Sequence, residues 1–138
     1  MERGFIMSKV KISYGILTCN EGDNIHKVLE LLCKHKRRCD EVVILDDYSV
    51  DPQTLNMLSM FEGRCRIENR IFDGDEGQRN HLNSLCSGDY IFQIDADELV
   101  PKMLVKDLPS LLSGGVTADL YLVPRENILT DIPYSQFH

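Results

Sequence analysis

Apolar runs rich in β-branched and aromatic residues alternate along the chain with segments whose apolar residues recur at helical spacing. The runs predict five strands, at residues 9–17, 41–45, 64–72, 89–94 and 119–123. The segments between them predict four helices, at about residues 24–38, 52–61, 78–86 and 101–113. We expect Asp23 or Asn24 to cap the first helix and Asp51 the second, because short side chains with an oxygen accept hydrogen bonds from a helix start. Residues 124–138 lack periodicity and are expected to be irregular.

This alternation of strand and helix predicts an α/β fold with a mainly parallel, Rossmann-like sheet and helices on both faces. The run 42–45 is apolar throughout, as is typical of a central parallel strand, whereas the more polar run 64–72 indicates a sheet edge. The 138 residues contain no linker and no internal repeat, and this length suits one domain. We therefore expect residues 1–138 to form a single domain.

Composition and charge narrow the classes of partner. The net charge of -7 opposes binding to nucleic acid or to anionic membranes. No apolar run reaches the roughly 18–20 residues that span a bilayer, and residues 1–9 do not resemble a signal peptide, so we expect a cytoplasmic protein. The five cysteines are odd in number and form no C-x-x-C pair, which predicts buried, reduced thiols. The basic run 34–38 is interpreted as a solvated helix end in preference to a phosphate-binding patch.

Polar side chains follow three of the predicted strands, where ligands bind in open α/β sheets. They are Thr18, Asn20, Glu21, Asp46, Asp47, Asp95, Asp97 and Glu98. Crowded carboxylates repel one another unless some are protonated or a cation lies among them. Asp95 and Asp97 are two positions apart, so in an extended segment they point the same way. Mg²⁺ and Mn²⁺ prefer such oxygen ligands, often together with substrate phosphates, so this pair predicts a divalent-cation site, with a solvated turn as the alternative.

Two further features allow both a functional and a structural interpretation. Asp46 and Asp47 could contact a nucleobase or a ribose, or they could stabilise the turn after their strand. Arg79, at the start of a predicted short helix, suits contacts with phosphate or base. The alternative interpretation is an ordinary surface arginine with no role in binding. The residues alone leave both choices open.

Four segments, in order and with characteristic spacing, together resemble the family 2 glycosyltransferases, which have the GT-A fold. They are 16–21 (ILTCNE), 43–51 (VILDDYSVD), 77–80 (GQRN) and 88–98 (GDYIFQIDADE). The resemblance covers about residues 9–125. It implies a nucleotide-sugar site formed by Thr18, Asn20, Glu21, Asp46, Asp47, Arg79, Asp95 and Ala96. It also implies that Asp95 and Asp97 hold the metal that bridges the donor diphosphate, and Gln78 departs from the small residue that the family commonly has at this position.

The resemblance implies an enzyme that transfers a sugar from a nucleoside-diphosphate sugar, with UDP-sugars favoured, to a glycan, lipid or protein acceptor. Family members generally need Mn²⁺ or Mg²⁺ and invert the configuration of the sugar. Their catalytic base usually lies well after the D-x-D segment, where only Glu126 and Asp131 remain here. We therefore expect an N-terminal donor-binding portion or a reduced family member, with the catalytic residue unassigned.

Other classes of function remain as alternatives. A non-catalytic nucleotide-binding module, or an incomplete fragment on the same fold, is the main one. A phosphoreceiver-like domain is disfavoured because its acidic pair would follow the first strand, and here the pair Asp46 and Asp47 follows the second. A nucleotidyltransferase is disfavoured because residues 18–22 contain one glycine and no basic residue.

Overall fold

Four parallel strands form a sheet in the order β3-β2-β1-β4 in the computed structural model, which describes residues 10–113, 128–129 and 132–133. The strands are β1 (Ile12–Thr18), β2 (Glu41–Asp46), β3 (Arg66–Asn69) and β4 (Tyr90–Asp95). The continuous apolar strand β2 is central and the more polar β3 lies at an edge, as the sequence predicts. The predicted strand at 119–123 falls outside the described residues.

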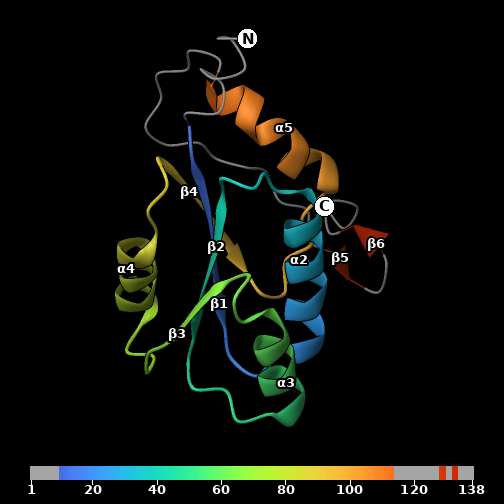
Figure 1. Ribbon diagram of the computed structural model, residues 1–138. Coiled ribbons are helices and arrows are strands. Elements are labelled where there is room, and N and C mark those ends of the chain that lie inside the picture. Colours follow the sequence, from blue (N-terminus) through green and yellow to red (C-terminus); the bar gives the residue numbers. More distant parts are fainter. Residues whose placement is uncertain (1–9, 114–127, 130–131, 134–138) are drawn as a thin grey trace.

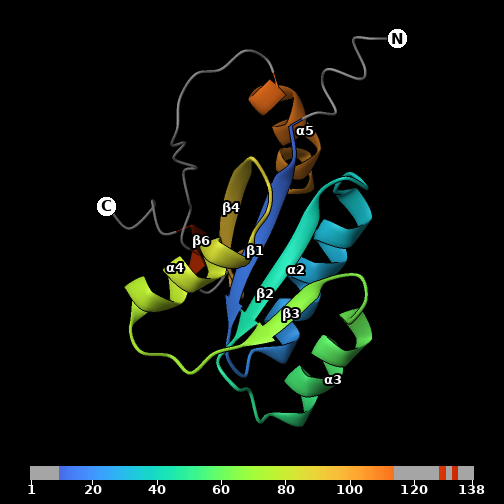
Figure 2. The same ribbon diagram turned by 60° about the vertical axis from the view of Figure 1, so that its left-hand side comes forward.

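Helices cover both faces of the sheet, which confirms the predicted α/β architecture. They are α2 (Gly22–His35), α3 (Pro52–Phe61), α4 (Asp75–Leu85) and α5 (Lys102–Ser113). Among them, α4 covers one face, whereas α2 lies between α3 and α5 on the other (Figures 1 and 2). A short antiparallel pair, β5 (Ile128–Leu129) and β6 (Ile132–Pro133), occurs where the sequence predicts irregular structure. Strands of two residues are too short to leave an alternating pattern in the sequence.

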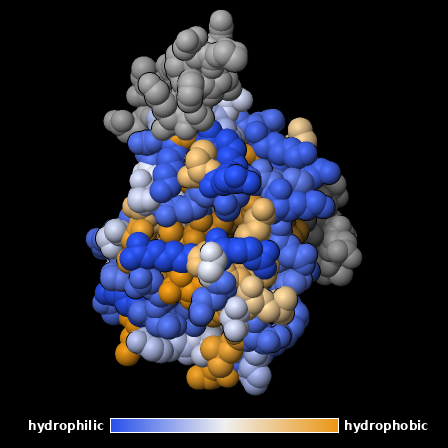
Figure 3. Space-filling model, viewed as in Figure 1, coloured by the Kyte–Doolittle hydropathy of each residue, from blue (hydrophilic) through white to orange (hydrophobic). Residues whose placement is uncertain are grey.

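The two faces of the sheet have cores of different size. The larger core packs β1 residues such as Ile12, Tyr14 and Ile16 against the buried side of α2, and the Tyr14 ring lies 5.9 Å from that of Phe92. The smaller core joins β2 to Leu82 of α4. Seen as in Figure 1, the surface is mostly hydrophilic, with apolar patches in its middle and at its lower edge (Figure 3). The apolar contact between α4 and the sheet is narrow, because its buried core consists of Val43, Leu45 and Leu82 with a few partly buried neighbours.

Glycine at position 15 brings α4 close to the sheet. A Cβ atom on Gly15 would lie 3.1 Å from Cδ2 of Leu82, so a larger residue on β1 would push α4 outward. Leu82 is completely buried. The position of every functional side chain on α4 thus depends on this small residue of β1.

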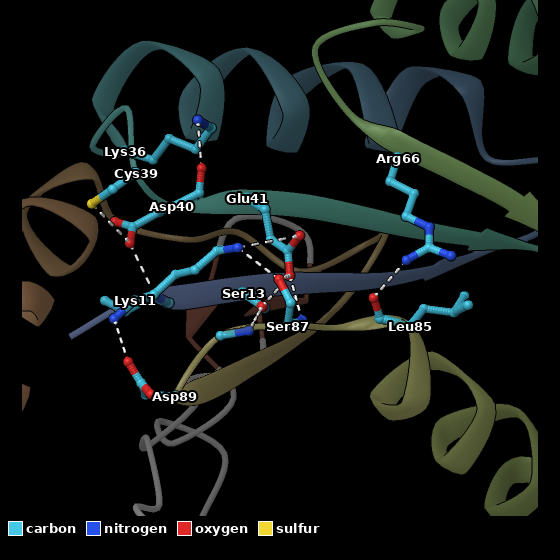
Figure 4. A network of polar contacts seen from close by, with 12 residues as sticks. Lys11, Ser13, Lys36, Cys39, Asp40, Glu41, Arg66, Leu85, Ser87 and Asp89 are labelled. Atoms are coloured by element: carbon cyan, nitrogen blue, oxygen red, sulfur yellow. Dashed lines mark hydrogen bonds and ion pairs between the residues drawn. The ribbon is translucent and has the colours of Figure 1, made fainter. Parts of the chain in front are cut away.

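A polar network ties the strands together at their amino ends (Figure 4). The buried Asp40 carboxylate accepts hydrogen bonds from the Ile12 backbone N–H and, through both oxygens, from Arg37, all at 2.9 Å. Arg37 also donates to the Val10 carbonyl. Part of the basic run 34–38, predicted to be a solvated helix end, therefore fastens α2 to the starts of β1 and β2.

A second group of contacts at this edge surrounds Glu41. Its carboxylate accepts from the Ser13 hydroxyl and from the Ser87 N–H, while the Gly88 N–H donates to Ser13 Oγ at 2.7 Å. Burial alone would raise the pKa of the Glu41 carboxyl, but the hydrogen bonds from Ser13 and Ser87 and the nearby charge of Lys11 hold it below its usual value. These contacts join β1, β2 and the turn before β4.

Several local predictions are corrected by the structure. Asp23 and Asn24 do not precede α2 but lie in its first turn, because the helix begins at Gly22, where a Cβ would lie 2.9 Å from the Thr54 N of α3. The Asp51 cap is confirmed, since its Oδ2 accepts from the Thr54 N–H at 3.0 Å. β3 is shorter than 64–72, and α4 begins three residues before 78.

The thiols are also less uniform than predicted. All five cysteines are free, and Cys65 is buried, but Cys19 and Cys39 are exposed. Cys39 lies in the loop before β2, and Cys19 lies in the loop after β1. The number and spacing of the cysteines indicate whether disulfides or metal sites are expected, but they do not show whether a single cysteine is buried or exposed.

Candidate donor-binding site

The carboxyl ends of three strands meet at one edge of the sheet, as their parallel order requires. In the register of the sheet, Thr18 at the end of β1 pairs with Asp46 of β2, and Leu17 pairs with Asp95 of β4. In the strand order β3-β2-β1-β4, the chain moves outward from β1 to β3 on one side and then returns to place β4 on the other side of β1. The ends of β1 and β4 therefore form a topological switch point, where α/β sheets bind ligands.

A pocket of about 310 Å³ opens at this edge. Six of the side chains predicted for the site line it: Thr18, Glu21, Asp47, Arg79, Asp95 and Asp97. Five lining residues that sequence reasoning did not assign to the site are Leu17, Cys19, Phe72, Asp75 and Gln78. The pocket thus combines several carboxylates with one arginine and one aromatic ring.

Negative charge accumulates on one side of this pocket. Burial raises the pKa of the Glu21 carboxyl, and the charges of Asp97 and Asp95 raise it further. The pKa of the Cys19 thiol is raised as well: the protein around this largely exposed group removes part of its hydration, and the charges of Asp47 and other carboxylates add to the effect. A cation among Glu21, Asp95 and Asp97 would relieve this repulsion.

The turn that carries Asp95 and Asp97 is held by its own hydrogen bonds. The Asp95 N–H donates to Glu98 Oε1 at 2.7 Å, and the Glu98 N–H donates to the Asp95 carbonyl at 2.9 Å. Ala96 is buried, and its N–H donates to the Leu17 carbonyl at 3.3 Å. Ala96 therefore anchors the turn to β1 while the exposed Asp97 remains free to turn toward a ligand.

Arg79 faces this acidic side from α4. Its Nη2 lies 3.2 Å from Oδ1 of Asp95, and its Nη1 donates to Oε1 of Gln93 at 3.3 Å. The Arg79 side chain keeps 39% of its exposure, so it remains accessible from the pocket. An arginine at this place can contact an anionic ligand while it balances the charge of Asp95.

Besides Ala96, two of the predicted residues do not line the pocket and instead shape the surrounding loops. The Asp46 carboxylate is buried and accepts from the N–H of Ser49 at 2.9 Å and from its hydroxyl. Asn20 accepts from the N–H groups of Val50 and Asp51 at 2.8 and 2.9 Å. Asp46 therefore holds the loop after β2 against the end of its own strand, and Asn20 holds that loop against the loop after β1.

Asn20 borders a neighbouring hollow of about 420 Å³, between the starts of α2 and α3. Glu21 lines both this hollow and the pocket at the strand ends. The hollow also contains Asp23 and Asp51, so its lining is acidic. Of the two cavities, only the pocket at the strand ends combines the acidic turn with Arg79.

Phe72 is the main lining residue that sequence reasoning missed. The residue is 49% exposed, and its backbone N–H donates to Oδ1 of Asp47 at 3.0 Å. The loop is braced by Arg70, which pairs with Asp73 at 2.9 Å and donates to Gln78 at 2.8 Å. The available signal was an aromatic residue directly before the run of acidic residues and glycine at 73–77. The same contacts explain Gln78, which is buried and donates back to the Arg70 carbonyl at 3.1 Å.

Comparison with known proteins identifies the family. The model of glycosyl transferase family 2 matches residues 13–127, which include all four of the motif segments. The chain belongs to glycosyl transferase family 2. This confirms the resemblance that the sequence carries.

Individual relatives of the family 2 chain support the same assignment. It is 32% identical over 132 residues to the lipopolysaccharide core biosynthesis glycosyltransferase LpsC of Rhizobium meliloti (strain 1021), a match that covers 94% of this chain and 47% of LpsC. The chain thus spans just under half the length of this relative.

Solved structures share the fold of this family 2 chain. Staphylococcus aureus TarS 1–349 in complex with UDP-GlcNAc matches with a TM-score of 0.65 and 22% identity, over 83% of this chain and 37% of that one. Mycobacterium tuberculosis glucosyl-3-phosphoglycerate synthase, in complex with Mn²⁺, UDP and glucosyl-3-phosphoglycerate, matches with a TM-score of 0.64 and 21% identity, over 80% and 42%. These likenesses confirm the GT-A fold.

The residues present fit a divalent cation that is only partly held by protein. Among the described residues, no three His, Cys, Asp or Glu side chains are grouped to hold a metal ion by themselves. Asp95 and Asp97 supply carboxylate oxygens, and hard cations such as Mg²⁺ commonly bind one or two carboxylates together with substrate phosphates. These oxygen ligands therefore suit a cation whose remaining ligands come from a bound diphosphate.

In the part of the chain that the structure describes, no helix is long and apolar enough to cross a membrane.

Proposed function

We propose that this chain binds a nucleoside-diphosphate sugar, with a UDP-sugar favoured, together with Mn²⁺ or Mg²⁺. The complete protein would then transfer the sugar to a glycan, lipid or protein acceptor with inversion of configuration. The observation that carries the proposal is the pocket at the ends of β1 and β4, which Asp95 and Asp97 line together with Arg79 and Phe72. Family membership supports sugar transfer as the reaction.

The nucleobase would lie at the Phe72 side of the pocket. Phe72 offers an exposed aromatic face for stacking. Asp47 accepts from the Phe72 backbone N–H with Oδ1, and its carboxylate lines the pocket beside this loop. A carboxylate oxygen can also accept a hydrogen bond from an N–H on the edge of a base, such as the ring N–H of uracil.

The diphosphate would lie between Arg79 and the acidic turn. Arg79 would contribute positive charge, and Asp95 and Asp97 would hold the cation. When bound, that cation neutralises the charge that develops on the departing nucleoside diphosphate. Thr18, Asn20, Glu21, Asp46 and Ala96 would shape the loops and walls around the donor. We assign no catalytic base among the described residues, and its position belongs to the acceptor-binding part of the protein.

Replacing Asp97 with alanine tests the cation site. Asp97 is exposed, so the variant should remain folded, but it should lose most of the rise in melting temperature that UDP and Mn²⁺ together give the parent chain. Differential scanning fluorimetry measures this rise, and Asp107→Ala, a substitution of an exposed residue on α5, is the matched control. An undiminished rise in Asp97→Ala would contradict the assignment of Asp97 as a metal ligand.

A further inference from the structure

A chain of polar side chains leads from the surface of α4 to the pocket. Gln93 Nε2 donates to Asn83 Oδ1 at 2.5 Å, and Gln93 Oε1 accepts from Arg79 Nη1 at 3.3 Å. Arg79 Nη2 then donates to Oδ1 of Asp95 at 3.2 Å. The order along this chain is Asn83, Gln93, Arg79, Asp95.

The spacing of the elements produces this arrangement. Gln93 and Asp95 are two positions apart on β4, so they point to the same face of the sheet, and that face carries α4. Arg79 and Asn83 are four positions apart on α4, so they lie on the same face of that helix. The two pairs therefore meet between the helix and the strand.

We propose that Gln93 is a positioning residue that fixes the Arg79 guanidinium in the orientation needed to bind the donor nucleotide, an inference that rests on the proposed function. Among the described residues, the hydrogen bonds of Arg79 go to Gln93 and Asp95. Asp95 is also a proposed cation ligand. When Asp95 turns to the cation, Gln93 is the contact that still holds Arg79.

The chemistry of an amide suits this role better than that of a carboxylate. A neutral amide oxygen accepts from the guanidinium without cancelling its charge, so Arg79 keeps its attraction for an anionic diphosphate. Asn83 fixes the direction of the amide, because its oxygen takes the Gln93 N–H and leaves Oε1 turned to Arg79. Gln93 is also a polar residue in a strand that is otherwise apolar up to Asp95.

The narrow apolar contact of α4 makes such support necessary. On this face of the sheet the buried core consists of Val43, Leu45 and Leu82, with a few partly buried neighbours. Arg79 lies almost one turn before Leu82 on α4. A long side chain at that place loses considerable rotamer freedom when it is held in one orientation, and Gln93 supplies a hydrogen bond that offsets this loss.

The decisive experiment is a double-mutant cycle on nucleotide binding, measured by calorimetric titration of UDP in the presence of Mn²⁺. Gln93→Met keeps the length of the side chain and removes the amide, and it should weaken binding about five- to tenfold. In an Arg79→Ala background the same substitution should have less than about a twofold effect, because a positioning residue acts only through Arg79. An equal loss in both backgrounds would overturn the proposal.

Two conservative variants separate orientation from simple packing. Asn83→Asp keeps the oxygen that accepts from Gln93 and should bind UDP within about twofold of the parent chain, whereas Asn83→Leu should weaken binding as Gln93→Met does. Gln93→Glu keeps an acceptor for Arg79 but adds a negative charge beside it, so it should also weaken binding of the anionic nucleotide. Parent-like affinity in both Gln93→Glu and Gln93→Met would overturn the role of the amide.

A second measurement needs no nucleotide and separates this inference from the proposed function. NMR relaxation of the Arg79 side-chain N–H should show restricted motion in the parent chain and increased motion in Gln93→Met. Equal mobility in the two proteins would overturn the positioning role. If Arg79 is restricted by Gln93 but the parent chain binds no nucleotide, the positioning contact stands and the proposed donor site is the part that fails.

Discussion

Replacing Asp40 with alanine should destabilise the chain strongly without changing the donor site. The Asp40 side chain is completely buried, and it accepts from Ile12 and from both Nε and Nη2 of Arg37. Its removal leaves the Ile12 N–H without its partner, at a cost of about 1–3 kcal/mol. It also leaves the Arg37 charge without its carboxylate, and breaking a buried ion pair typically costs about 3–5 kcal/mol in total.

Arg37 keeps 26% of its exposure and also donates to the Val10 carbonyl, so water and this carbonyl offset part of the loss. We therefore expect a loss near the lower end of that range, about 3 kcal/mol, and a melting temperature lowered by roughly 10 °C. Urea denaturation followed by circular dichroism measures the loss, and Asp107→Ala is the control. A loss below about 1 kcal/mol would refute the reasoning, because it would mean that these hydrogen bonds have little net effect. UDP affinity, measured where Asp40→Ala is folded, should equal that of the parent, since Asp40 lies at the opposite end of the strands.

Further predictions concern the base pocket and the amino edge of the sheet. Phe72→Ala should weaken UDP binding about tenfold in calorimetry, whereas Phe72→Tyr, which keeps a ring, should bind like the parent. The folded chain holds the pKa of Glu41 below its unfolded value of 4.5, so the stability that Glu41 contributes is present above pH 4.5 and is lost as the pH falls through the folded pKa. Acid should therefore lower the free energy of unfolding more steeply in the parent than in Glu41→Gln, and an equal pH dependence of the two proteins would contradict this. Gly88→Ala would place a Cβ 2.7 Å from the Ser13 N, and it should lower the free energy of unfolding by about 1–3 kcal/mol in urea titrations.

The meeting of the strand ends could be predicted because it follows from pattern and topology. The apolar runs locate β1, β2 and β4, and parallel order then brings Thr18, Asp47 and Asp95 to one edge. The separate roles of Asp46 and Asp47 could not be predicted in this way. Adjacent residues in an extended segment point to opposite sides of the strand. Only the fold shows that the Asp46 side chain turns inward to accept a hydrogen bond from Ser49, while Asp47 faces the pocket.

The start of α4 and the role of Phe72 were missed for local reasons. Residues 73–77 contain two glycines, which predict a loop, yet Gly74 adopts a φ of 126° just before a helix that begins at Asp75. Acidic residues at 75 and 76 suit a first helical turn, and this weaker signal was correct. Phe72 at the end of an edge strand resembles a core residue in sequence, and its exposure depends on the loop that Arg70 and Asp47 hold in place.

The central claim is that the pocket at the ends of β1 and β4 binds a nucleoside diphosphate through a divalent cation. Calorimetric titration of UDP and of GDP into this chain, first with Mn²⁺ and then with EDTA, tests it most directly. We expect UDP to bind with Mn²⁺, GDP to bind more weakly, and EDTA to remove most of the affinity. A folded sample that binds neither nucleotide, or one that binds UDP equally well in EDTA, would contradict the account.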